Sequence, residues 1–208
     1  MPLYKTITPD QSTKVLIWKI EETFEGLARE IELTTHCQNR VNSMKSDLHR
    51  RGFMSIRHLL AEVGLCDADI EYSPHGKPHL KSDTHYISIT HSHHFSAIIV
   101  SDKPVGVDVE KQRNKILRIA HKFTTLSEYH NVANEEALVR KLSVVWGAKE
   151  SLYKLHGIRG LLFLNHIHVD DFDLDSGKTK AQVYIKGKRH DHNLNFLEFE
   201  GFTGVFTA

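Results

Sequence analysis

The chain has 208 residues, of which 40% are hydrophobic and 25% charged, and its formal net charge is +1. These values are ordinary for a globular protein, so they exclude a disordered chain and give no general case for nucleic-acid binding. Two cysteines are too few for a disulfide framework, and we expect both to be buried. The first ten residues lack the regions of a signal peptide, and no run of about 18 apolar residues follows. We therefore expect a cytoplasmic protein without a membrane span.

Hydrophobic periodicity predicts the elements of the first half in chain order. Residues 15–20 fit a strand and residues 23–31 a short helix. A longer helix is predicted between Ser46 and Gly64, because apolar residues recur there at helical spacing and glycine provides a stop signal. Alternation with period two then predicts an antiparallel meander, with strands at residues 86–90, 95–100 and 105–110.

Helical periodicity returns in the second half. It is weak over residues 115–123 and strong over residues 135–156, where Gly157 fits a helix C-cap. Strands are predicted to close the chain at residues 166–174, 181–186, 194–200 and 202–207. Each half thus contains strands and helices in a similar order. This predicts an α+β fold of two similar packed lobes with pseudo-twofold symmetry, residues 1–103 and 104–208, each with helices against a small, mostly antiparallel sheet.

Two acidic residues stand out in the segment Gly106-Val107-Asp108-Val109-Glu110. Residues two apart on a strand point the same way, so both carboxylates would leave one face of the sheet. Two like charges so close repel each other unless a cation, a proton or an arginine intervenes, and a hard divalent cation with oxygen ligands does this well. The alternative is an exposed strand that carries two solvated acids.

A second segment, Trp146-Gly147-Ala148-Lys149-Glu150-Ser151-Leu152-Tyr153-Lys154, lies on the long predicted helix. Glu150 and Lys154 are one turn apart and therefore meet on the same side. The alternative is an ordinary surface ion pair, which contributes only about 0.3–0.5 kcal/mol.

Together the two segments resemble the signatures of the Sfp-type 4′-phosphopantetheinyl transferases. This family has a Gly-hydrophobic-Asp-hydrophobic-Glu strand and, about 40 residues later, a Trp-x-x-Lys-Glu-Ser helix. The resemblance spans residues from about 50 to 157, and three smaller similarities support it. They are Gly76-Lys77-Pro78, the pair Thr90-His91, in which the family usually has serine, and the segment from Phe123 to Glu128.

The resemblance implies an enzyme that transfers 4′-phosphopantetheine from coenzyme A to a serine of an apo acyl or peptidyl carrier protein and releases adenosine 3′,5′-bisphosphate. It implies Mg²⁺ held by Asp108, Glu110 and Glu150, with Glu150 and Lys154 as the catalytic residues. The coenzyme A contacts that it implies are Arg50, Arg57, Lys77, Thr90, His91, Lys149 and Lys154. For the arginines, the alternative is a set of solvated cations on a helix face.

Four basic residues follow Glu110 at spacings of four, three and four. If the segment is helical, Lys111, Lys115, Arg118 and Lys122 form a stripe next to the predicted metal site. We expect this stripe to dock the carrier protein, whose acidic helix is implied by the resemblance. The alternative is a solvated amphipathic helix. Separately, we expect the chain to be a monomer.

The sixteen histidines support a different function, a metal-binding or pH-sensing module without catalysis. In that hypothesis, His91 and His93 share one face of a strand and His94 lies nearby. None of the histidine groups has a carboxylate or cysteine at a familiar zinc spacing, so the transferase hypothesis explains more of the sequence.

Overall fold

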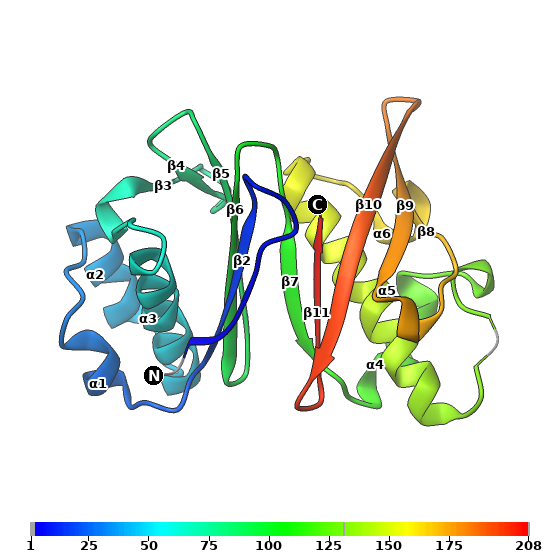
Figure 1. Cartoon of the computed structure of the whole chain (residues 1–208), viewed down its shortest axis with the longest axis horizontal. Coiled ribbons are helices and arrows are strands. Elements are labelled where there is room, and N and C mark those ends of the chain that lie inside the picture. The colour runs from blue at the N-terminus through cyan, green and yellow to red at the C-terminus, as the bar shows by residue number, and fades with distance from the viewer. Residues whose placement is uncertain (1–2, 131, 208) are drawn as a thin grey trace. The chain divides into compact units, whose positions relative to one another are not determined.

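The computed structural model describes residues 3–130 and 132–207. The chain divides into two compact units, Met1–Pro104 and Val105–Ala208. Both units combine helices with antiparallel sheets, which confirms the predicted α+β class (Figure 1). Among the described residues, none of the helices has the length and apolar character needed to cross a membrane.

The N-terminal unit contains a four-stranded antiparallel sheet in the order β1-β2-β6-β5 and a two-stranded ribbon, β3-β4. Its strands are β1 (Leu3–Ile7), β2 (Lys14–Lys19), β3 (Ile70–Tyr72), β4 (Pro78–Leu80), β5 (Tyr86–Ser92) and β6 (Phe95–Ser101). Its helices are α1 (Phe24–Ala28), α2 (Thr35–Ser43) and α3 (Asp47–Ala61). The helices lie on one face of the four-stranded sheet (Figure 1).

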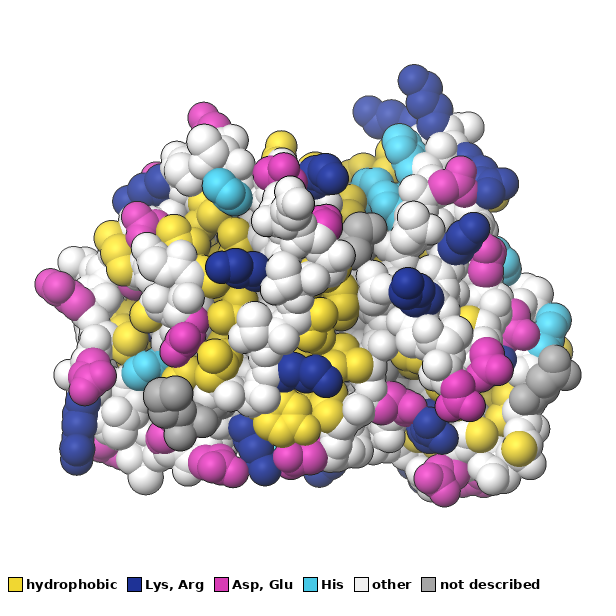
Figure 2. Space-filling view, viewed as in Figure 1, with side chains coloured by type: hydrophobic (Ala, Val, Ile, Leu, Met, Phe, Trp, Pro, Cys, Tyr) yellow, Lys and Arg dark blue, Asp and Glu magenta, His cyan; other side chains and the backbone are white. Residues whose placement is uncertain are grey.

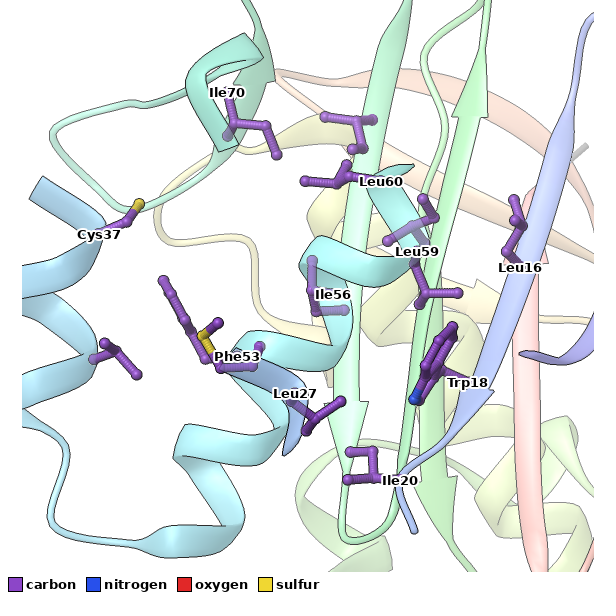
Figure 3. Packing of buried hydrophobic residues seen from close by; sticks show 14 of the residues in the cluster. Leu16, Trp18, Ile20, Leu27, Cys37, Phe53, Ile56, Leu59, Leu60 and Ile70 are labelled. Carbon is purple, nitrogen blue, oxygen red and sulfur yellow. The ribbon is translucent and has the colours of Figure 1, made fainter. Parts of the chain in front are cut away.

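Helix α3 forms because its sequence places an apolar stripe toward that sheet. Ser46 caps its N-terminus by accepting a hydrogen bond from the His49 amide at 3.4 Å. The apolar side chains of α3 then fill the space over β2 and β6, as Figure 3 shows for part of the core. The labelled side chains from α3 and β2 are Phe53, Ile56, Leu59, Leu60, Leu16 and Trp18.

The C-terminal unit contains a five-stranded antiparallel sheet in the order β7-β11-β10-β9-β8. Its strands are β7 (Val107–Lys111), β8 (Ile167–Val169), β9 (Lys178–Ile185), β10 (Lys188–Phe199) and β11 (Phe202–Thr207). Its helices are α4 (Lys115–Ile119), α5 (Glu135–His156) and α6 (Phe163–His166). Helix α5 has the predicted bounds, because Asn134 caps its start and Gly157, at φ 62°, ends it in a left-handed conformation.

Several elements differ from the sequence predictions. β7 pairs with β11 and not with β6, so the predicted meander of three consecutive strands is wrong. Of the three strands of the predicted meander, only β5 and β6 form a hairpin, and the chain leaves their sheet at the turn before Val105. Strands β1, β3 and β4 and helix α2 were not predicted, because each is short or has few apolar residues. Cys37 is buried as expected, whereas Cys66 is exposed.

Candidate active site

Two glycines allow helix α5 and strand β7 to pack unusually close together. A Cβ atom on Gly106, just before β7, would lie 1.9 Å from the carbonyl oxygen of Ser151 on α5. A Cβ atom on Gly147 of α5 would lie 2.7 Å from Val205 Cγ2 on β11 and 3.8 Å from Asp108 Oδ2. Neither position can hold a side chain without moving the helix away from the sheet. Both glycines belong to the two recognised segments, but neither was predicted to have a role.

This close packing brings together the three predicted carboxylates, Asp108 and Glu110 from β7 and Glu150 from α5. Asp108 is buried, and Glu110 and Glu150 are half-buried. Burial and then the charge of Asp108 raise the pKa of Glu150 to about 7. The same two causes raise the pKa of Glu110, which a hydrogen bond from Trp146 partly opposes. The three acids therefore form one electrostatically coupled group.

Lys154 lies one turn beyond Glu150 and contacts the most buried of these acids. Its Nζ atom is 2.7 Å from Asp108 Oδ1 and donates a hydrogen bond of 3.0 Å to the carbonyl oxygen of Val107. The structure thus brings together all four residues predicted for metal binding and catalysis. Lys154 was predicted to be a catalytic residue that contacts coenzyme A, and here its ammonium pairs with a carboxylate.

A hard divalent cation is the group that three clustered carboxylates fit best, because such cations prefer oxygen ligands. The donor set is suitable, and burial, followed by the charge of Asp108, raises the pKa values of Glu110 and Glu150, which a bound cation would oppose. As the side chains stand, however, no three His, Cys, Asp or Glu residues in the described ranges form a ready metal cluster. Binding of an ion would therefore require these side chains to rearrange.

Lys149, predicted to contact coenzyme A, points into the core of the C-terminal unit. Its side chain is fully buried, and its Nζ atom lies 2.7 Å from Glu128 Oε2. It also donates to the carbonyl oxygens of Phe123 and Phe163, at 2.6 and 3.1 Å. Glu128 in turn accepts from the Val169 amide at 3.0 Å. We therefore revise the role of Lys149 from a ligand contact to a structural residue. It connects helix α5 with the segment from Phe123 to Glu128 and with Phe163.

Arg57 is buried in the same way in the N-terminal unit. Its guanidinium lies 2.8 Å from Asp67 Oδ1 and donates to the carbonyl oxygen of Phe53 at 3.1 Å. Burial alone would raise the pKa of Asp67, but hydrogen bonds from Thr34 and the charge of Arg57 lower it. An arginine held by these partners has no donor directed outward, so we revise Arg57 to a structural residue. Arg50 is half-buried, and its guanidinium lies 3.8 Å from the centre of the Phe24 ring.

The remaining predicted nucleotide contacts surround strand β5. Lys77 precedes β4 and is half-buried, which lowers its pKa. Thr90 is buried and His91 is exposed, and neighbours on a strand point to opposite faces, so these two side chains do not share a face. His93, which the alternative hypothesis placed on a strand, lies in the turn after β5 at φ 50°. The proposed alignment of His91 and His93 is therefore wrong.

The predicted basic stripe is shorter in the structure than in the sequence analysis. Lys111 ends β7 and lies 6.0 Å from the Phe202 ring centre, outside the helical segment. Lys115, Arg118 and Lys122 are exposed on α4 and the turn after it. Lysine and arginine side chains also gather at the tip of the hairpin of β9 and β10 (Figure 2), where Lys186, Lys188 and Arg189 are exposed.

Comparison with known proteins agrees with the resemblance that the two segments carry. Residues 104–203, which include β7 and α5, match the sequence model of the 4′-phosphopantetheinyl transferase superfamily. The resemblance of this chain to the Sfp type is confirmed by its relatives.

Three of these relatives are 4′-phosphopantetheinyl transferases. The enzyme gsp of Aneurinibacillus migulanus is 28% identical over 131 residues, which cover 62% of this chain and 53% of that protein. One from Bacillus subtilis is 32% identical over 122 residues, 54% of each chain. Sfp of Bacillus subtilis strain 168 is 29% identical over 157 residues, 68% of this chain and 69% of that protein. The first two matches span about half the length of those relatives.

Proposed function

We propose that this protein transfers the 4′-phosphopantetheine group of coenzyme A to a serine hydroxyl of an acyl or peptidyl carrier protein. The observation that carries the proposal is the coupled group of Asp108, Glu110 and Glu150 with Lys154, built from the two segments that resemble the family signatures. Names of the relatives support the same class of reaction. In this reaction the serine oxygen bonds to the β-phosphorus of coenzyme A, and the pyrophosphate bond breaks to release adenosine 3′,5′-bisphosphate.

Asp108, Glu110 and Glu150 would hold Mg²⁺, once Lys154 leaves Asp108. The bound ion would supply positive charge against the pyrophosphate oxygens and so stabilise the leaving group. The histidine module without catalysis is not favoured, because His93 lies in a turn and no histidine cluster in the described part of the chain forms a metal site.

Glu150 is the residue that we propose as proton acceptor. Without an ion, the pKa of Glu150 is raised to about 7, and a bound divalent cation would favour its ionised form, which can take the proton of the serine hydroxyl as the new bond forms. Its position at the half-buried end of the group, next to buried Asp108, provides the desolvation that raises this pKa. Lys154, released from Asp108, would interact with the departing phosphate through its ammonium group.

For the nucleotide end of coenzyme A, we propose contacts from residues of the N-terminal unit. His91 is exposed and Lys77 half-buried, and both can offer a charged donor to the 3′-phosphate. Arg50 and Thr90 complete the proposed set. Lys149 and Arg57 are left out, because internal partners occupy their donors.

For the carrier protein, we propose docking on the exposed cations of α4 and the turn that follows it. Lys115, Arg118 and Lys122 begin within a few residues of Glu110, where the serine must arrive. Complementary charge would speed the encounter and fix its orientation more than it would add affinity.

A direct assay tests the proposal. The protein is incubated with coenzyme A, Mg²⁺ and an apo carrier protein, and the products are measured by mass spectrometry. We expect a mass gain on the carrier equal to one phosphopantetheine group and an equal amount of free adenosine 3′,5′-bisphosphate. The Asp108→Asn variant serves as the inactive control. An unmodified carrier across a panel of fatty-acid, polyketide and peptide-synthesis carriers would contradict the proposed function.

A further inference from the structure

The ion pair between Lys154 and Asp108 lies within the group of three carboxylates that we propose as the metal site. The Lys154 ammonium lies 2.7 Å from Asp108 Oδ1, and Asp108 shares a strand face with Glu110. The other carboxylate oxygen of Asp108 lies 3.8 Å from the Cβ position of Gly147, three residues before Glu150 on α5. Lys154 therefore contacts the most buried of the three acids, and Arg113 is a second positive charge that acts on Glu110.

A second lysine on the same helix shows what a permanent pair looks like. Lys149 and Glu128 have side-chain exposures of 0% and 1%, and the ammonium has two further carbonyl partners. The Lys154 side chain is 27% exposed, and its described partners are one carboxylate oxygen and one carbonyl. Lysine has a long, flexible stem, so Lys154 can leave Asp108 toward solvent, whereas Lys149 has no such path.

We propose that Lys154 is the resident counter-cation of Asp108 and that a divalent metal ion binds this site by displacing the Lys154 ammonium. The inference rests on the proposed function, because it assumes that the three carboxylates are the metal site. Lys154 would thereby lower metal affinity in the empty enzyme and become available to an anionic substrate only when the ion is present. Binding of the metal ion would thus also release Lys154 toward the substrate.

Competition between the two cations is a coupling free energy. It can therefore be measured as the effect of Lys154 on metal affinity or as the effect of the metal on Lys154. The first measurement is the affinity for Mn²⁺ in the absence of coenzyme A. The electron paramagnetic resonance signal of the free ion reports how much Mn²⁺ is unbound. We expect Lys154→Met to bind Mn²⁺ roughly ten- to a hundredfold more tightly than the wild type, because the competing charge is gone. Lys154→Arg keeps the charge and should bind with nearly wild-type affinity.

The second measurement uses the wild type and so does not depend on the folding of a variant. The enzyme is treated briefly with an amine-acylating reagent, and labelling of each lysine is quantified by peptide mass spectrometry. Added Mn²⁺ should increase labelling of Lys154, with half-saturation at the same concentration as binding. Lys149 is the internal control, and its labelling should stay low at every Mn²⁺ concentration. In Asp108→Asn the response of Lys154 should disappear.

The outcomes separate this inference from the proposed function. Saturable Mn²⁺ binding to the wild type, with unchanged or weaker binding to Lys154→Met, would overturn the competition and leave the metal site intact. Mn²⁺ binding without any rise in Lys154 labelling would overturn it as well. If neither the wild type nor Lys154→Met binds Mn²⁺ saturably, the metal site itself is wrong, and the proposed function loses its metal.

Discussion

The two units share one packing feature, a close contact between a helix and a sheet at a glycine, but the side chains near this contact differ. In each, one long helix approaches an antiparallel sheet at a glycine: Gly52 of α3, whose Cβ would lie 2.6 Å from the His91 ring, and Gly147 of α5, whose Cβ would contact Val205. In each, the helix also anchors a fully buried ion pair, through Arg57 in the N-terminal unit and Lys149 in the C-terminal unit.

The two units differ in the side chains that lie near this glycine. The glycine of α5 brings a helical carboxylate beside two strand carboxylates, whereas the glycine of α3 leaves an exposed histidine on β5. A fully buried cation, Lys149, and a partly exposed one, Lys154, thus occur on the same helix and within the same recognised motif. Exposure and partners distinguish them, and the residue type does not.

The strongest test of this comparison removes the buried cations. Lys149→Met and Arg57→Met should each destabilise the protein by about 3–5 kcal/mol, because each leaves a buried carboxylate without its partner. The free energy of unfolding is measured by urea denaturation, with Lys188→Met on the exposed hairpin as the control. Lys149→Met with Glu128→Gln should recover part of the loss, because glutamine is neutral and its amide oxygen can still accept from the Val169 amide. A stable Lys149→Met protein with a raised KM for coenzyme A would restore the role that the sequence analysis gave to Lys149.

The next test asks whether the coupled carboxylates act in catalysis and not in folding. Asp108→Asn keeps the shape of the side chain but removes its charge, so we expect kcat to fall by about 10²–10³ with little change in Tm. Glu136→Gln, an exposed acid in the first turn of α5, is the matched control and should leave kcat unchanged. Excess EDTA should reduce wild-type activity to the level of Asp108→Asn. Full activity in EDTA would argue against a metal.

A smaller effect should separate the nucleotide contact of the N-terminal unit from the chemistry of the C-terminal unit. His91→Ala should raise the KM for coenzyme A by about tenfold, the size expected for one charge-assisted hydrogen bond. The KM for dephospho-coenzyme A should change much less, because that ligand lacks the 3′-phosphate. His75→Ala, also exposed, is the control. Equal losses with both ligands would place His91 away from the 3′-phosphate.

The smallest expected effect concerns docking of the carrier protein. Lys115→Glu with Arg118→Glu should raise the KM for the carrier several-fold at low ionic strength, on the order of 1 kcal/mol, and leave the KM for coenzyme A unchanged. The effect should fade as salt screens the charges. Lys188→Glu with Arg189→Glu reverses the same number of charges at the tip of the β9–β10 hairpin. If both double variants behave alike, general charge and not the α4 surface attracts the carrier.

The sequence by itself determined the features that depend on neighbours along the chain. Helix α5 was predicted with its observed bounds, because periodicity and a C-terminal glycine are local signals. The shared direction of Asp108 and Glu110 followed from the period of a strand. The two recognised segments also carried the resemblance to the Sfp-type transferases, because each is a short run of neighbouring residues.

Only the tertiary structure decided which strands pair and which cations are buried. The local pattern of β7 is the same whether it lies beside β6 or β11, so pairing depends on contacts far away in the sequence. Lys149 and Glu150 are neighbours in one motif, but successive helical residues point about 100° apart. The face that the sheet covers therefore places Lys149 in the core and Glu150 in the site, and the sequence motif contains both without telling them apart.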